Sequence, residues 1–162
     1  MKNKDKPDNI IRVDHSIRPS YPGWVKMVVH PELENTGPVE YDILKVEWWL
    51  IERQMYFHKS QKGSASIEHD EGTRIYTYLR EMDMLKFCLG LLDLEEIQKK
   101  GIAFFGKYFQ KNDILHVFGW KSISMDFDGN LCVPFLYGYR SVDIMWAWMG
   151  STFGLHIPVL RF

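Results

Sequence analysis

The feature that most constrains the fold is a change in residue pattern at Asp113, where the spacing of apolar side chains shifts to a period of two. This period is typical of β-strands, whose successive side chains point to opposite faces. Asp128-Gly129 lies between two such runs, and an Asp-Gly pair in this position predicts a tight hairpin. We therefore expect strands near 114–118, 120–127, 131–139 and 142–149, with a further short strand at 157–162.

Pro134 falls inside the strand expected at 131–139. Proline has no backbone N–H, so a sheet accommodates it only where that donor is not needed by a neighbouring strand. The sequence therefore predicts that this strand is bulged, or has one edge unpaired, at Pro134.

Helical spacing dominates the middle of the chain. Asp93, followed three residues later by Glu96, resembles a capping box. This pattern predicts a helix from Leu94 to about Phe109 with Asp93 as its N-cap. Further helices are expected near 24–30, 74–82 and 84–89.

The segment 43–55 fits two structures. Leu44 and Trp48 belong to an apolar stripe at helical spacing, and Asp42 could cap such a helix. The same segment alternates as a strand would, through Leu44, Val46, Trp48 and Leu50. We prefer the helix because the polar residues 52–54 extend it well, and the strand stays open as the alternative.

Helices in the middle of the chain and strands at its end predict an α+β fold, with central helices packed on a C-terminal antiparallel β-meander of three to five strands. A chain of 162 residues has the length of one ordinary domain. Residues 1–9 are polar and are expected to form a flexible tail, so the single α+β domain would span 10–162. An edge strand is expected at 10–13.

The net charge limits the kinds of binding partner to expect, and the cysteine content indicates the redox state of the compartment. Twenty basic and 21 acidic residues give a net charge of −1, which is not the broadly basic balance of a typical nucleic-acid-binding domain, although a local basic patch is still compatible with it. Cys88 and Cys132 lie in apolar surroundings and are expected to be free thiols in a reducing compartment. No stretch resembles a signal peptide or is long enough to span a bilayer, so we expect a soluble cytoplasmic protein without a membrane partner.

Aromatic residues are the outlier in the composition, at 15% of the chain. They concentrate in the last two long strands, where alternation predicts an aromatic face on each strand and a second apolar face opposite it. One face must pack on the helices; the other is either buried by the rest of the chain or exposed to a partner. The candidate binding residues are Phe135, Tyr137, Tyr139, Trp146, Trp148 and Trp120, with Arg140 and Lys121 as a basic rim.

No motif names a reaction. The run 67–72 is rich in carboxylates and imidazole, but it lacks metal-ligand spacing such as His-Glu-x-x-His. Asp14 and His15 are adjacent, and sequence neighbours seldom face each other as an acid–base pair. We therefore predict no catalytic residue, no metal site and no cofactor from sequence.

Two classes of function follow from these patterns. The first is a non-catalytic binding module that recruits a protein partner or a nucleic acid through the aromatic sheet face, with a homodimer through the same face as one form of association. The second is a small intracellular hydrolase whose His and acidic residues converge only in the fold. A pocket shared by two or more of His15, His116, His156 and Asp143 would favour the hydrolase.

Overall fold

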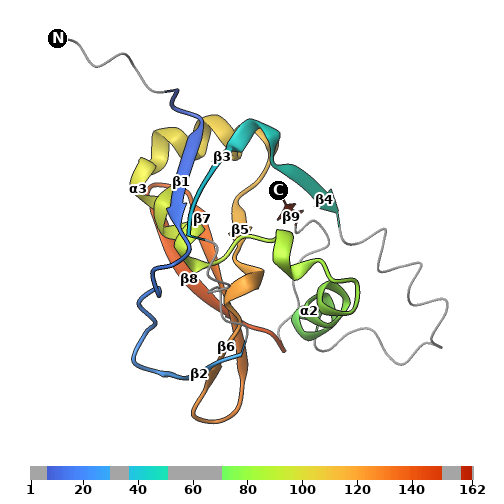
Figure 1. The fold of residues 1–162 in the computed structure, drawn as a ribbon. Helices are drawn as coiled ribbons and strands as arrows, with labels where there is room; N and C mark the ends of the chain where they lie inside the picture. The colour runs from blue at the N-terminus through green and yellow to red at the C-terminus, as the bar shows by residue number, and fades with distance from the viewer. Residues whose placement is uncertain (1–6, 30–36, 51–70, 151–157, 162) are drawn as a thin grey trace.

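The computed structural model describes residues 7–29, 37–50, 71–150 and 158–161, and it shows a mixed α+β fold (Figure 1). The helices are α2 (Glu71–Glu81) and α3 (Leu91–Tyr108), with short 3-10 helices η1 (Ile43–Lys45), η2 (Leu85–Phe87), η3 (Gln110–Asn112) and η4 (Trp120–Ser122). The strands are β1 (Ile10–Asp14), β2 (Val25–Val28), β3 (Pro38–Asp42), β4 (Glu47–Leu50), β5 (His116–Phe118), β6 (Ser124–Asp126), β7 (Leu131–Gly138), β8 (Val142–Trp148) and β9 (Pro158–Arg161).

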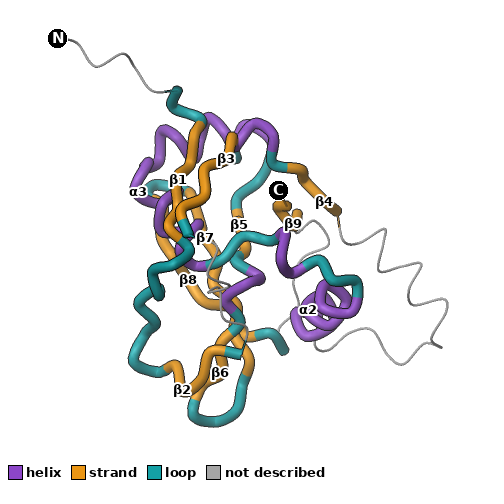
Figure 2. Tube along the Cα trace, viewed as in Figure 1, coloured by secondary structure: helices purple, strands orange, loops and turns teal. Residues whose placement is uncertain are grey.

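The main sheet is antiparallel and is built around β7, the strand predicted to follow the Asp-Gly turn. β5 and β6 pair with one edge of β7, β8 pairs with the other, and β2 extends the sheet beyond β6 (Figure 2). The predicted hairpin is confirmed: Gly129 has φ +86°, a value that glycine adopts readily. The carboxylate of Asp126 also accepts the backbone N–H groups of Asp128 and Asn130 across the turn.

Pro134 lies in β7 at the place where its edge changes partner. The residues before it pair with β6 and the residues after it pair with β5, whereas η4 and its flanks occupy the gap between the two. The carbonyl of Pro134 accepts the backbone N–H of Gly119 at 2.8 Å. The missing donor of proline therefore falls where no strand requires it, as the sequence predicted.

Both faces of the main sheet carry a core. On one face, Val117, Leu136 and Val142 pack with the apolar side of α3, and β1 adds Ile11 to the same cluster. On the other face, the cluster around Val133 takes in α2, η2 and η4, and Trp120 is its largest fully buried side chain. This arrangement confirms the predicted α+β class, with helices packed on a C-terminal antiparallel sheet.

Two predicted helices are strands instead. The segment 24–30 contains β2, which pairs with β6, and 43–55 contains only the single 3-10 turn η1 before β4, which pairs with β9. Asp42 does cap η1, since its carboxylate accepts the backbone N–H of Leu44 at 2.9 Å. In both segments, hydrogen bonds to a strand more than 90 residues away outweigh the local helical spacing.

α3 begins earlier than the sequence predicted. Its N-cap is Gly90, so the helix starts at Leu91, and Asp93 occupies the third helical position instead of the cap. From there its carboxylate accepts the N–H of Gly90 at 2.8 Å. Gly101, at φ +82°, then divides α3 into two helical pieces at a kink.

Two smaller expectations changed, and three others are confirmed. The helix predicted near 84–89 is the 3-10 turn η2, which no side chain caps, and the first half of the strand expected at 120–127 is the 3-10 turn η4. The helix expected at 74–82 is α2, and the edge strand expected at 10–13 is β1. Cys88 and Cys132 are both free thiols, and burial raises the pKa of Cys88 to about 12.

Within the described residues, no helix has the length and apolar character needed to cross a membrane. The single domain spanning 10–162 and the flexible tail at 1–9 stay predictions, because residues 1–6 and several internal segments lie outside the description.

Gly138 marks the closest approach between β7 and α3, and it supplies the first testable prediction. A Cβ at this position would lie 2.2 Å from the ring of Phe105, which is fully buried and cannot move aside. Gly138→Ala should therefore lower the free energy of unfolding by about 1–3 kcal/mol, the usual cost of overpacking. Urea denaturation would measure this.

The matched control for Gly138→Ala is Gly23→Ala. A Cβ at Gly23 meets no atom within 4 Å, and the residue has no positive φ. An equal loss of stability in both variants would contradict steric contact with Phe105 as the cause.

Candidate functional site

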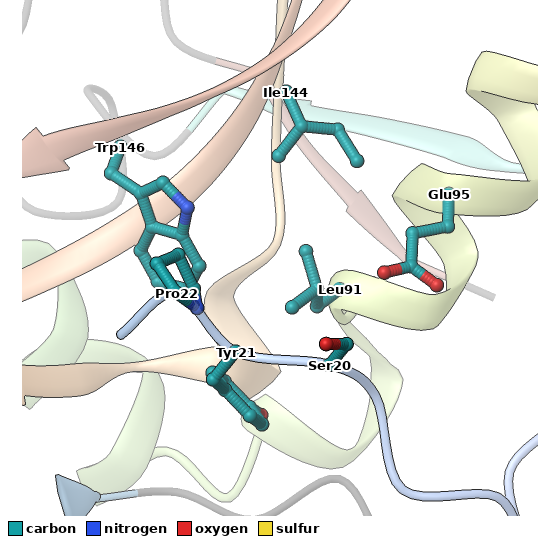
Figure 3. Close-up of a pocket in the computed structure, with 7 residues that line it drawn as sticks. All are labelled: Ser20, Tyr21, Pro22, Leu91, Glu95, Ile144 and Trp146. Atoms are coloured by element: carbon teal, nitrogen blue, oxygen red, sulfur yellow. The ribbon is translucent and has the colours of Figure 1, made fainter. Parts of the chain in front are cut away.

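A pocket of about 330 Å³ opens on the α3 side of the main sheet, between β8, the first turns of α3 and the segment that joins β1 to β2. We call that segment, residues 15–24, the strap. Figure 3 shows side chains from all three elements around one space, into which Leu91, Glu95, Ile144 and Trp146 project, whereas the ring of Tyr21 points to its side. The lining residues are Ser20, Tyr21 and Pro22 of the strap, Leu91 and Glu95 of α3, and Ile144 and Trp146 of β8.

The strap leaves β1 through a tight turn held by Asp14. Its carboxylate accepts both the backbone N–H and the hydroxyl of Ser16, at 3.0 and 2.6 Å, and these bonds hold the pKa of Asp14 below its usual range. Pro19 and Pro22 then fix the backbone φ angle at two further places. The strap is therefore restrained at its start and along its length, which sets the position of one pocket wall.

A buried polar cluster attaches the strap to α3. The Nε2 of His15 lies 3.3 Å from Oδ1 of Asp93, and both side chains are almost completely buried. The hydroxyl of Tyr41, on β3, donates to the same oxygen at 3.2 Å. Burial, followed by the neighbouring Asp93, raises the pKa of Tyr41 well above its usual range, so the phenol keeps its proton and acts as a donor.

Aromatic rings form the wall of the pocket opposite α3. Trp146 meets Tyr21 with ring centroids 6.3 Å apart and planes tilted by 50°. Trp24 lies nearly perpendicular to Trp146, at 5.1 Å and 89°. We call these three rings the aromatic corner. Trp24 is 37% exposed, so the corner reaches from the pocket wall to the surface.

Glu95 is the charged group of the pocket, and it is half-buried. Burial raises the pKa of its carboxyl, with Lys99 opposing that shift and Glu96 adding to it. The residue at i+4, Lys99, would be its usual partner on a helix surface. Lys99 instead bonds to the carboxylate of Glu96. Glu95 makes no hydrogen bond or ion pair with any residue in the described parts of the chain.

The predicted aromatic surface is divided by the strand register. Residues opposite each other in an antiparallel pair project to the same face. Tyr137 is opposite Asp143 and Phe135 is opposite Met145, whereas Trp146 is opposite Pro134. Phe135 and Tyr137 therefore lie on one face of the sheet, and Trp146 and Trp148 lie on the other, so these four side chains do not form one surface.

The face away from α3 carries its own row of rings. His116 stacks on Tyr137 with centroids 5.2 Å apart, and Phe135 lies against both His116 and Phe118. The rings of Phe118 and Trp120 continue the row toward the core. The row merges with the buried cluster around Val133.

Two of the predicted binding residues belong to the core. Trp120 is fully buried and Lys121 is only 8% exposed, because both lie in η4, which folds inward between β5 and β6. They are therefore corrected from surface residues to core residues. Tyr139 and Arg140 are exposed in the turn between β7 and β8, and the Arg140 guanidinium lies 5.8 Å from the centroid of the Tyr139 ring.

Trp148 is 53% exposed at the end of β8, on the same face as Trp146. Its ring lies against the backbone of Gly150, where a Cβ would approach the ring to 2.4 Å. Of the eight predicted binding residues, the structure places only Trp146 in the pocket wall.

The remaining wall residues were missed by the sequence analysis. Two features could have identified part of the wall: the proline-punctuated aromatic strap with Tyr21 and Trp24, and the pair Leu91 and Glu95, which a helix starting at Leu91 puts on one face. Nothing local indicates that the strap and α3 meet at β8.

Of the four residues that would favour a hydrolase, the three that the structure describes do not converge. His15 is in the core with Asp93, and His116 and Asp143 lie on the sheet face away from the pocket. His156 and residues 67–70 of the polar run lie outside the described residues. Within the described parts of the chain, no group of three or more His, Cys, Asp or Glu side chains could hold a metal ion.

Comparisons with protein families, with curated proteins and with solved structures find no significant match to this chain.

The polar cluster gives a second prediction. Removing the Asp93 carboxylate leaves three donors, from His15, Tyr41 and Gly90, without their acceptor. Asp93→Ala should therefore cost about 3–5 kcal/mol of unfolding free energy, because buried partners are left unsatisfied. Loss of a helix cap alone would cost only about 0.5–2 kcal/mol. Chemical denaturation separates the two values.

Glu40→Ala is the control for Asp93→Ala. Glu40 forms an ion pair with Arg12 between side chains that are about half exposed, and such pairs contribute about 1 kcal/mol or less. A cost for Asp93→Ala within the range of a simple cap would show that the cluster adds no stability.

His116 supplies a third prediction, which concerns pH. His116 is exposed overall, but partial burial of its imidazole beside neighbouring rings lowers its pKa below the ordinary value of about 6.5. NMR titration of the imidazole should give this lowered value, and Tyr137→Ala should raise it toward the ordinary value by exposing the ring to water. Tyr139→Ala, which removes an exposed tyrosine, should leave it unchanged. A His116 pKa that Tyr137→Ala does not raise would contradict burial by that ring as the cause.

Proposed function

We propose that this protein is a non-catalytic binding module that recruits a protein partner through the aromatic corner and the pocket beside it. The observation that supports this most directly is the pocket itself, which rings from the strap and from β8 line together with one half-buried carboxylate. Rigid aromatic rings bury much area at little entropic cost, and tryptophan and tyrosine are enriched at the centres of protein interfaces.

The sign of the charge favours a protein over a nucleic acid. A nucleic-acid site needs cationic groups for phosphates. Among the described residues, the one charged side chain that lines this pocket is the carboxylate of Glu95. A phosphate backbone would be repelled there, whereas the mixed side chains of a peptide would not.

The lining also favours binding over catalysis. Hydrolysis by a serine needs a base within hydrogen-bonding reach that is oriented by a third group. Ser20 lines the pocket, but no histidine, lysine or cysteine lies beside it in the lining. The lining groups are suited to contact and to hydrogen bonding, and none of them provides an activated nucleophile.

A peptide-library selection tests the proposal. The full chain is panned against displayed random peptides, and enriched sequences are resynthesised and titrated against the wild type and against Trp24→Ala. Trp24 is partly exposed, so its truncation should preserve the fold, which circular dichroism would verify. We expect a shared motif whose affinity falls at least tenfold in Trp24→Ala, as a residue worth more than about 1.4 kcal/mol at an interface would cause.

Leu44→Ala is the matched control, because Leu44 is an exposed apolar residue on η1, outside the pocket lining. It should bind the selected peptides as the wild type does. If no motif is enriched, or if the two variants behave alike, the aromatic corner is not the interface. Tighter binding of a random single-stranded oligonucleotide than of any selected peptide would favour the nucleic-acid alternative.

A further inference from the structure

We propose that the pocket receives a cationic ammonium group, carried by a lysine side chain of the partner, between the Glu95 carboxylate and the rings of Tyr21 and Trp146. This inference rests on the proposed function and specifies which part of the partner is recognised. It follows from a half-buried carboxylate that makes no hydrogen bond or ion pair within the described residues, from the chemistry of the pocket walls and from the size of the pocket.

The first observation is the half-buried carboxylate of Glu95. A half-buried carboxylate loses part of its hydration, and that loss is offset only if a hydrogen-bond donor or a cation replaces the water. Glu95 makes no hydrogen bond or ion pair in the described parts of the chain, because the ammonium of Lys99 is bonded to Glu96. Burial raises the pKa of Glu95, and the nearby charge of Lys99 offsets that rise only in part. A ligand ammonium would supply both the charge and the donors.

The walls select for a cation of this kind. The face of an indole or phenol ring attracts a cation within about 6 Å of its centroid, and this contact contributes roughly 0.5–2 kcal/mol depending on exposure. The tilt of 50° between Tyr21 and Trp146 gives two ring planes that do not close against each other. Leu91 and Ile144 supply apolar surface for the methylene stem of a lysine.

The size of the pocket fits one side chain. A volume of about 330 Å³ is at the lower end of the range for small-ligand sites, which runs from about 300 to 1,000 Å³. None of the described residues that line the pocket is cationic, so none of them repels an incoming ammonium. Trp24, at the rim of the aromatic corner, would contact the peptide on either side of the lysine.

The test uses three matched probes with the full chain. Acetyl-lysine-methylamide carries the ammonium, its trimethylated form carries the same charge without N–H donors on the side-chain nitrogen, and acetyl-norleucine-methylamide is a neutral analogue that keeps the carbon chain and lacks the ammonium. Binding is followed by NMR, through the indole N–H of Trp146 and the amide of Glu95. We expect both cations to shift these signals and the neutral probe to bind at least about tenfold more weakly, as a combined ion-pair and cation–π contribution would give.

Glu95→Gln keeps the shape of the side chain and removes its charge. This variant should lose about tenfold in affinity for the lysine probe and should bind the neutral probe as the wild type does. Glu40→Gln, which removes a carboxylate from β3, should change neither affinity. Equal binding of charged and neutral probes, or an undiminished affinity in Glu95→Gln, would overturn the ammonium proposal.

The two proposals fail in different ways. If selected peptides depend on Trp24 but contain no lysine and ignore Glu95→Gln, the binding function stands and the ammonium specificity is wrong. If no peptide is enriched and no probe shifts the Trp146 signal, both are wrong. If the lysine probe binds and depends on Glu95 but no peptide motif is enriched, the pocket recognises a free amine, and recruitment of a protein is wrong.

Discussion

The buried carboxylate of Asp93 is the interaction on which the arrangement of the α3 side depends. It accepts hydrogen bonds from three parts of the chain: His15 at the start of the strap, Tyr41 on β3, and the backbone of Gly90 at the N-cap of α3. Burying a carboxylate is costly unless donors replace its water, and here three donors do so. The positive end of the helix dipole adds to this compensation, because Asp93 lies in the first turn of α3.

This single group also determines where the pocket forms. By closing the N-terminus of α3 at Gly90, it sets the helix phase so that Leu91 and Glu95, four residues apart, turn to the same side. By holding His15, it brings the strap across to that side. Two pocket walls therefore depend on one carboxylate, while the third, β8, is fixed independently by its pairing with β7.

The parts of the fold that could be predicted are those encoded locally. The Asp128-Gly129 hairpin, the Pro134 gap and α2 each follow from residues close together in sequence. β4 could not be predicted in the same way, because its hydrogen bonds come from β9, more than 100 residues later, and those bonds outweigh a weak helical pattern.

The site could not be predicted for a related reason: the register between β7 and β8 depends on the length of the turn that joins them. β7 and β8 are joined through Tyr139, Arg140 and Ser141, which puts Gly138 opposite Val142. In that register, odd-numbered residues face odd-numbered residues, so Tyr137 shares a face with Asp143. Alternation identifies which residues of one strand lie together, but the length of the turn decides which of them join residues of the next strand. Alternation is visible in the sequence, whereas the register of β7 against β8 is visible only in the structure.

In the observed register, the two sets of aromatic rings lie on opposite faces of the sheet and have different surroundings. On the face away from α3, the rings lie against one another in a row that ends in the core: His116, Tyr137, Phe135 and Phe118. These rings therefore pack mainly against other rings of the same chain. On the α3 side, Trp146 meets the rings of Tyr21 and Trp24 from the strap, and the half-buried carboxylate of Glu95 lines the same pocket. An aromatic wall that lacked such a charge would be equally compatible with packing against any apolar surface. The combination of an aromatic wall with one half-buried anion is what favours a cation as the ligand that we propose.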